Sequence, residues 1–459
     1  MTENAQLQDL LDQGAKLYGA GHTAAAAKIY RRALKIAPKD PTVRLRHATA
    51  IWHGENRAEE ALAEIRDLCR AYPQAVLYAT EGMILSSLGR FAEAAVAARA
   101  ALKADPSHSS AWLDLATAVE VDDAPAAIDE LRVVLSDPQA TPKMRRDMHF
   151  ALARLLRKTG DQDAAFAQTV AANNLVDQTW SAKTELGFRI ELRAIFTPDL
   201  IQQRHGEGLL DDRMVFIVGM PRSGTTILER MLLAHPDVGS AGETTAVGRT
   251  FLQLRDQVGG TIDGVRKNLS PGNLQAMAKA VLNDVEARLG AARPKRIIDK
   301  MPANYLFVPL IGLTLPNARI IHMQRHPLDT GLSCFEAHFA FGLDYAARLD
   351  SLGEAYRMYA DLMEDWRELP QPKIHRICYE RLVADTEAEM RALLAHCGLP
   401  WDPACLHPSQ SGAIKTASID QARSDLNDRS VGRWRDHADR LSPLIDAMGG
   451  MDWVERQSK

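Results

Sequence analysis

The spacing of hydrophobic positions changes once along the chain, near residue 177. Before that point Ala and Leu recur at helical intervals with almost no strand pattern. The prolines that close successive segments are Pro38, Pro73, Pro106 and Pro138, which lie 35, 33 and 32 residues apart. A period near 34 residues with helical spacing inside it predicts a stack of paired helices.

Small residues recur at matching offsets inside these segments: Gly14, Gly21, Ala26 and Ala33 in the first, and Gly82, Gly89, Ala94 and Ala101 in the third. Paired helices need small residues there because they approach closely to bury a shared face. This is the tetratricopeptide signature, and it predicts five repeats over residues 1–177, the fourth degraded after Asp122-Asp123. We expect a groove that binds a peptide or partner segment; helices that only stabilise their neighbours are the open alternative.

Residues 178–212 are expected to connect this array to a second domain over 213–459. There, apolar runs alternate with helical patterns, which is typical of a parallel sheet covered on both faces. The expected strands are 215–218, 296–298, 319–323 and 374–378, and the clearest helices are 274–289 and 351–366. The predicted fold is therefore an all-α solenoid followed by a P-loop-like α/β domain, whose ligands bind at the carboxyl ends of the strands.

The first strand leads into Gly219-Met-Pro-Arg-Ser-Gly-Thr-Thr226, which has the spacing of a phosphate-binding loop except that Thr225 replaces the lysine. Backbone N–H groups and the start of the following helix can hold an anion without that lysine. The lysine of such loops reaches the β- and γ-phosphates of a triphosphate. We therefore expect a 5′-phosphate group rather than ATP or GTP; a glycine-rich turn without a ligand is the alternative.

The third strand ends in Arg325-His326-Pro327, and Ser333 follows on a predicted helix. Arginine offers a fixed fork of donors that suits a second phosphate, and Ser333 is placed to contact the same group. The alternative is a structural bridge between Arg325 and Asp329. We interpret His326 as a packing or capping histidine.

These motifs together resemble the sulfotransferases that use 3′-phosphoadenosine 5′-phosphosulfate. The resemblance extends over the whole chain to bacterial tetratricopeptide-repeat sulfotransferases, whose catalytic domain is similar to tyrosylprotein sulfotransferase. The residues that carry it are the loop 216–226, Ala234-His-Pro-Asp-Val238, Gly242-Glu243, Asp299-Lys300, Arg325-His326-Pro327 with Ser333, Tyr379-Glu380 and Gly432-Arg433-Trp434.

The resemblance implies which residues hold the donor. The 5′-phosphate is assigned to the loop, and the 3′-phosphate to Arg325 and Ser333. Tyr379 matches a donor-contacting tyrosine, while Gly432 and Arg433 belong to a segment that closes over the nucleotide. This donor has no β- or γ-phosphate, which explains Thr225, and its product is adenosine 3′,5′-bisphosphate. The loop residues concerned are Arg222, Ser223, Gly224, Thr225 and Thr226.

Sulfuryl transfer to a hydroxyl needs a base for the acceptor and positive charge near the leaving oxygens. By resemblance Glu243 is the base, Lys300 stabilises the bridging oxygen and Arg222 stabilises the sulfuryl oxygens. Ser418 is expected to assist. Some sulfotransferases use a histidine base, and His338 stays open as an alternative.

Composition and charge limit the kinds of partner and location that we expect for this protein. The net charge is −4 with both signs interspersed, which argues against nucleic acid as a partner. No run approaches the roughly 18 apolar residues of a membrane span, and the first residues do not resemble a signal peptide, so a cytoplasmic location is expected. The five scattered cysteines indicate neither a disulfide frame nor a metal site. Asp299 mimics a magnesium-binding aspartate, but without the loop lysine we expect no metal.

The sequence thus predicts a sulfotransferase that acts on a hydroxyl acceptor, with a tyrosine of a peptide or protein as the candidate and a saccharide or small metabolite left open. The repeat array is expected to recruit the substrate or a partner. The alternative function is a repeat scaffold whose nucleotide-binding domain is inactive. A nucleoside-triphosphate enzyme is disfavoured by Thr225.

Overall fold

The computed structural model describes residues 3–458 except 20, 56, 178, 291, 340–341, 409–425 and 427. The chain forms two compact units. The first contains residues up to 177 together with a short segment around 336–342. The second contains the rest of the described chain from 179 onwards.

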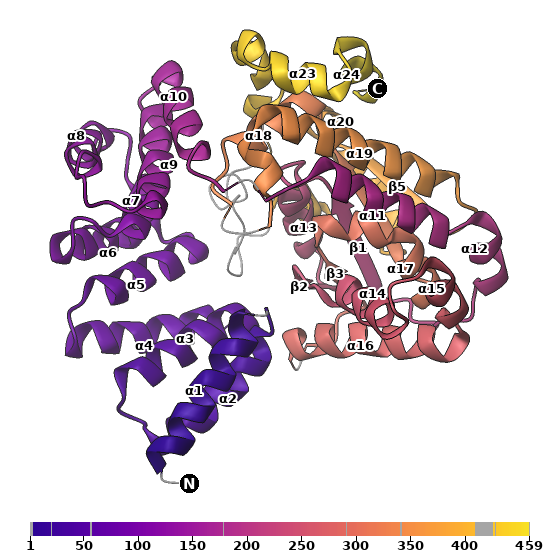
Figure 1. Ribbon diagram of the computed structural model, residues 1–459, viewed down its shortest axis with the longest axis horizontal. Helices are drawn as coiled ribbons and strands as arrows, with labels where there is room; N and C mark the ends of the chain where they lie inside the picture. Colours follow the sequence, from indigo (N-terminus) through magenta and orange to yellow (C-terminus); the bar gives the residue numbers. More distant parts are fainter. Residues whose placement is uncertain are drawn as a thin grey trace. The chain divides into compact units, whose positions relative to one another are not determined.

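The described part of the first unit consists of ten successive helices, which confirms the predicted helical repeat fold (Figure 1). In the expected fourth pair α7 packs mainly against α9 and touches α8 only weakly. Small residues sit where the helices meet. A Cβ on Gly14 would lie 2.4 Å from the ring of Tyr30, and Ala94 and Ala101 are fully buried. The helices are α1 (Glu3–Gly19), α2 (Thr23–Ile36), α3 (Pro41–Glu55), α4 (Ala58–Ala71), α5 (Ala75–Leu88), α6 (Phe91–Ala104), α7 (Ser109–Ala118), α8 (Ala124–Leu135), α9 (Pro142–Lys158) and α10 (Gln162–Asn173).

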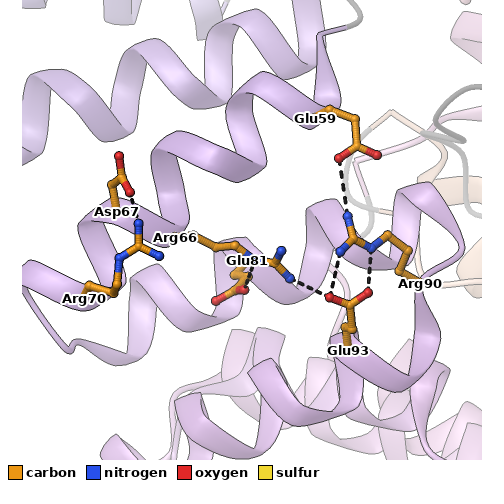
Figure 2. Close-up of polar contacts among 7 residues, drawn as sticks. All are labelled: Glu59, Arg66, Asp67, Arg70, Glu81, Arg90 and Glu93. Carbon is orange, nitrogen blue, oxygen red and sulfur yellow. Dashed lines mark hydrogen bonds and ion pairs between the residues drawn. The ribbon is translucent and has the colours of Figure 1, made fainter.

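A network of ion pairs covers the surface formed by α4, α5 and α6 (Figure 2). Arg66 pairs with Glu81 at 2.8 Å and with Glu93 at 2.7 Å, and Arg90 also pairs with Glu93 at 2.7 Å. A groove of about 380 Å³ lies beside this network, lined by Arg66, Tyr78, Glu81, Ala92, Glu93, Val96, Ala97 and Ala100. The side chains around this groove are partly apolar and partly charged.

The second unit is built on a five-stranded parallel sheet with the order β2-β3-β1-β4-β5. The predicted α/β fold class is confirmed. Four strands coincide with the predicted ones, whereas the fifth, β2, was not predicted. The strands are β1 (Met214–Gly219), β2 (Val238–Gly242), β3 (Arg296–Asp299), β4 (Arg319–Gln324) and β5 (Ile374–Cys378).

Helices cover both faces of the sheet, as alternation along β4 shows. Ile321 and Met323 point into an apolar cluster shared with α13 and α21. His322, between them, points the other way and lies 2.5 Å from the hydroxyl of Tyr359 on α19. The helices are α11 (Ala182–Ile195), α12 (Pro198–Arg204), α13 (Thr225–Leu233), α14 (Ala246–Gln257), α15 (Ile262–Asn268), α16 (Pro271–Leu289), α17 (Val308–Thr314), α18 (Pro327–Phe335), α19 (Leu349–Glu368), α20 (Tyr379–Ala384), α21 (Thr386–His396), α23 (Ser442–Met448) and α24 (Met451–Gln457), with 3₁₀ turns η1 (Pro302–Phe307), η2 (Asp344–Ala347), η3 (Pro403–Leu406), η4 (Asp428–Ser430) and η5 (Arg433–Arg440).

The stretch expected to connect the two domains is largely helical and packs into the second unit. Helix α11 lies against α19. Its Arg189 is 2% exposed and donates to the Tyr305 hydroxyl at 2.6 Å. Thr197 then caps α12 by accepting from the Leu200 N–H. These residues help to form the core of the α/β unit.

Candidate active site

The loop between β1 and α13 has the backbone shape that its glycines predict. Gly224 has φ 104°, and a Cβ there would lie 2.8 Å from the Tyr379 ring, so both conformation and space require glycine. Arg222 also has a positive φ of 68°. Buried Ser223 donates its hydroxyl to the Met220 carbonyl at 2.8 Å, which holds the turn. The loop therefore delivers the first N–H groups of α13 to the carboxyl edge of the sheet.

The sheet register brings the second predicted phosphate contact next to this loop. Gly219 at the end of β1 lies opposite Met323 on β4, so the two strands end side by side. The Arg222 Nε atom donates to Ser333 Oγ at 3.1 Å, and Arg325 donates to the Arg222 carbonyl at 3.2 Å. The Arg325 guanidinium lies 5.3 Å from the centre of the Tyr379 ring. Four residues from distant parts of the sequence thus meet at one place.

Arg325 fits an anionic ligand. It is 8% exposed, and its Nε atom has no hydrogen-bond partner among the described residues. A buried guanidinium N–H without a partner is costly, and a phosphate oxygen is the acceptor that its fork geometry suits.

Asp329 does not bridge Arg325, which was the alternative interpretation of this motif. Its two carboxylate oxygens instead accept from the backbone N–H groups of Gly432 at 2.7 Å and Trp434 at 2.9 Å. Gly432 has φ 76°, a conformation that favours glycine. Arg433, between the two N–H donors, starts η5. Asp329 therefore fastens the segment that was predicted to close over the nucleotide.

His326 and Arg325 complete this attachment. The His326 ring stacks on Trp434 with centroids 5.3 Å apart, and its Nδ1 accepts from the Leu328 N–H at 3.2 Å. Arg325 donates to the Ser430 carbonyl. The histidine thus has a packing and capping position, and the C-terminal segment lies directly against the predicted phosphate site.

The second part of the site is an acid and a base at neighbouring strand ends. On the paired strands β2 and β3, Gly242 lies opposite Asp299, so the next residues, Glu243 and Lys300, are adjacent. Their side chains form an ion pair. Thr244 donates to Asp299 at 2.6 Å, which ties the two turns together. The side chain of Lys300 is 2% exposed and that of Glu243 is 41% exposed.

Burial and charge set the protonation of this cluster. Burial alone would lower the pKa of the Lys300 ammonium, but the carboxylates of Glu243 and Glu229 outweigh it and raise that pKa above its usual value. Burial raises the pKa of Asp299 to about 7, against the opposing hydrogen bonds from Thr244. Burial also raises the pKa of Glu229. Lys300 therefore stays charged at neutral pH, whereas Asp299 gains or loses its proton close to neutral pH.

Sequence reasoning missed Glu229 and the structural role of Asp299. Glu229 lies on a helix, and its only signal was a carboxylate in the segment 227–233, where every residue except Glu229 and Arg230 is apolar. Asp299 had been weighed only as a metal ligand. In the part of the chain that the structure describes, no three His, Cys, Asp or Glu side chains form a cluster that could hold a metal ion.

Two other candidates are placed differently. Ser418 lies outside the described residues. His338 belongs to the first unit, where its Nε2 lies 2.9 Å from Asp147 Oδ1. Burial would raise the pKa of Asp147, but hydrogen bonds from His338, Ser109 and Lys143 lower it to about 2. His338 is thus engaged with a buried carboxylate of α9.

Known protein families match both parts of the chain. Residues 214–403 match the model of a sulfotransferase family, and residues 11–76 and 80–144 match that of the tetratricopeptide repeat. The chain therefore contains a sulfotransferase-family domain preceded by tetratricopeptide repeats. No helix within the described ranges has the length and apolar character needed to cross a membrane.

Individual relatives cover different shares of the chain. An uncharacterized protein of Aquifex aeolicus is 30% identical over 424 residues, 86% of this chain and 53% of that protein. The protein-tyrosine sulfotransferase of Drosophila melanogaster is 27% identical over 258 residues, 51% of each chain. The chain thus spans about half the length of these two relatives. Among solved structures, the sulfotransferase domain of the Synechococcus PCC 7002 olefin synthase is 18% identical over 55% of this chain and 96% of that one, with a TM-score of 0.40.

Proposed function

We propose that the second unit is a sulfotransferase that uses 3′-phosphoadenosine 5′-phosphosulfate and acts on a hydroxyl acceptor. The observation that carries this proposal is the meeting, at one edge of the sheet, of an anion-binding loop without its lysine and a buried ammonium paired with an accessible carboxylate. The donor, when bound, supplies the sulfuryl group and leaves as adenosine 3′,5′-bisphosphate.

Different residues of this chain would bind the two phosphate groups of the donor. The N–H groups at the start of α13 with Thr225 and Thr226 would hold the 5′-phosphate, and Arg325 with Ser333 would hold the 3′-phosphate. Arg222, which contacts Ser333, carries positive charge between the two positions. Asp329 holds the Gly432 backbone, which would cover the bound nucleotide.

Glu243 and Lys300 have complementary tasks in the chemistry. Glu243 is the accessible member of the pair, so its carboxylate can accept a proton from an acceptor hydroxyl that approaches from solvent. Lys300 is buried and charged, and it would stabilise negative charge on the leaving oxygen. A preorganised donor of this kind typically contributes about 3 kcal/mol to transition-state stabilisation.

We further propose that the acceptor is a tyrosine of a peptide or protein and that the repeat unit recruits it. Support comes from the similarity to protein-tyrosine sulfotransferases and from the repeats, whose stacked helices offer an extended surface. The groove beside α4, α5 and α6 combines exposed Val96 with charged rims at Arg66 and Glu93. Such a surface suits a segment with apolar and charged side chains.

Two measurements on the full chain test the proposal. Calorimetry should show saturable binding of adenosine 3′,5′-bisphosphate. Incubation with ³⁵S-labelled donor should then label a tyrosine-containing peptide, with the phenylalanine version as the matched control. Binding without labelling of any hydroxyl acceptor in a cell extract would favour the inactive scaffold. Absence of binding would contradict the proposed function.

A further inference from the structure

Lys300 has a second carboxylate neighbour that the proposed chemistry does not use. Glu229 lies on α13, and its Oε2 is 3.9 Å from Lys300 Nζ. The Glu229 side chain is 11% exposed, whereas that of Glu243 is 41% exposed. The ammonium therefore has an inner carboxylate shielded from solvent and an outer carboxylate open to it.

A hydrogen-bonded serine fixes the inner carboxylate and links it to the turn that carries the outer one. The Ser240 hydroxyl donates to Glu229 Oε1. The same hydroxyl oxygen accepts from the Gly242 N–H at 2.9 Å, directly before Glu243. Glu229 is thus held by β2 on one side and faces Lys300 on the other.

The two carboxylates respond differently when a proton arrives. If Glu243 takes a proton, its negative charge disappears from beside Lys300. A buried ammonium without a paired charge is strongly disfavoured and tends to lose its proton. The charge of Glu243 also raises the pKa of Glu229, so neutralising Glu243 makes Glu229 hold its own charge more firmly. The inner ion pair therefore strengthens when the outer one is lost.

We propose that Glu229 is a positioning residue that keeps Lys300 protonated and in place while Glu243 takes the acceptor's proton. This inference rests on the proposed function of the site. The acceptor hydroxyl gives its proton to Glu243 and its oxygen bonds to sulfur, while the bond from sulfur to the phosphate oxygen breaks and its electron pair leaves with that oxygen. Lys300 keeps all its protons throughout.

Two other charged groups near this cluster also favour the charged forms of Glu229 and Lys300. Arg230, the next residue on α13, lowers the pKa of Glu229 by its positive charge. When ionised, Asp299 raises the pKa of the neighbouring Lys300. Glu229 is the buried carboxylate that forms an ion pair with Lys300, so we assign the role to it.

A titration of Lys300 tests the proposal without any turnover. The full chain is labelled with [ε-¹³C]lysine, and the Lys300 signal is assigned by its loss in Lys300→Arg. Glu243→Gln imitates the protonated base, and in this variant Lys300 should stay protonated through pH 8. Adding Glu229→Gln should lower the Lys300 pKa by at least about one unit, the usual effect of losing an opposite charge at this range. If the double variant does not fold, Glu229→Gln alone should still lower that pKa.

Two results would overturn the role of Glu229. One is a Lys300 that titrates below pH 8 in Glu243→Gln alone. The other is a Lys300 pKa that does not change when Glu229→Gln is introduced. Because neither result depends on sulfuryl transfer, the titration decides the matter even for a chain without turnover.

Kinetics separate this inference from the proposed function. In Glu229→Gln the alkaline limb of kcat should move to lower pH by at least about one unit, a tenfold loss on that limb, with KM for the donor unchanged. Glu286→Gln on α16 is the control, because Glu286 is 49% exposed and pairs with Arg213. If the wild type turns over and Glu229→Gln keeps the wild-type pH profile, the positioning role fails. If the wild type does not turn over at all, the proposed function fails instead.

Discussion

The ion-pair network on α4, α5 and α6 of the repeat unit and the Lys300 cluster of the α/β unit differ in how far their charged side chains are buried. In the repeat unit Arg66, Arg90 and Glu93 form a surface network in which 34–47% of each side chain is exposed. In the α/β unit Lys300 is 2% exposed and faces two carboxylates. Exposed pairs contribute little to stability because solvent screens them, whereas a buried charge is costly. The burial of Lys300 among carboxylates therefore indicates a functional cluster. Substitutions in the surface network, in contrast, are expected to change stability little.

The largest effect is expected from Glu243→Gln, which removes the base and keeps the shape. The transfer rate should fall by about 10² to 10⁴ because general base catalysis typically contributes that factor. Binding of adenosine 3′,5′-bisphosphate should not change, since Glu243 pairs with Lys300 and neither phosphate is assigned to it. Labelled-donor kinetics and calorimetry measure the two quantities. Loss of binding with normal turnover would contradict the assignment.

Asp299 should make the free energy of unfolding depend on pH. Its pKa is about 7 in the folded chain and 3.8 as the reference for the unfolded one. Between these values only the folded state holds the proton, so stability falls as pH rises from about 4 to 7 and levels off above 7. Three pKa units correspond to at most about 4 kcal/mol.

Asp299→Asn should remove that dependence, because asparagine can still accept from Thr244 but cannot ionise. Urea denaturation at several pH values measures the slope. Asp263→Asn, at an exposed position on α15, is the matched control and should keep the wild-type slope. Equal slopes in wild type and Asp299→Asn would show that the buried carboxyl does not titrate in this range.

Arg325→Ala should weaken binding of adenosine 3′,5′-bisphosphate by about 10- to 100-fold, the value of a charge-assisted hydrogen bond of roughly 1.5–3 kcal/mol. Adenosine 5′-monophosphate lacks the 3′-phosphate, so its affinity should be nearly the same for wild type and variant. Calorimetry with both nucleotides gives the coupling free energy between Arg325 and the 3′-phosphate directly. An equal loss for both would place Arg325 on a different part of the ligand.

The smallest effect is expected in the repeat unit. Arg90→Ala removes the ion pairs with Glu93 and Glu59. The free energy of unfolding should change by no more than about 1 kcal/mol, and the change should shrink further in high salt. Denaturation at low and high salt measures it. A loss of several kcal/mol would mean that this network is structural after all.

The sequence predicted the fold class well but not every element. The proline period and small residues such as Gly14 were enough to predict the repeats, because a larger side chain at Gly14 would clash with Tyr30 of the paired helix. Strand β2 was missed since Val238-Gly-Ser-Ala-Gly242 has glycines and small residues in place of β-branched ones. Only the tertiary structure shows that β2 lies at the edge of the sheet next to β3.

The residues assigned to the site from the resemblance stay predictions, and the structure adds how they meet. Arg222 is hydrogen-bonded to both Ser333 and Arg325, although 111 residues separate Arg222 from Ser333. Asp329, weighed from the sequence as a partner of Arg325, instead holds Gly432 and Trp434. A local motif shows which side chains are nearby in the chain, but not which backbone will arrive from a hundred residues away.

The sequence by itself determined the repeat array, the loop after β1 and the absence of a lysine at Thr225. These features are local, since they depend on spacing within one turn or one period. Only the tertiary structure decided that Glu229 and Glu243 both lie beside the buried Lys300. The reason is physical: strand order and register set which side chains become neighbours, and burial then sets how strongly their charges act on one another.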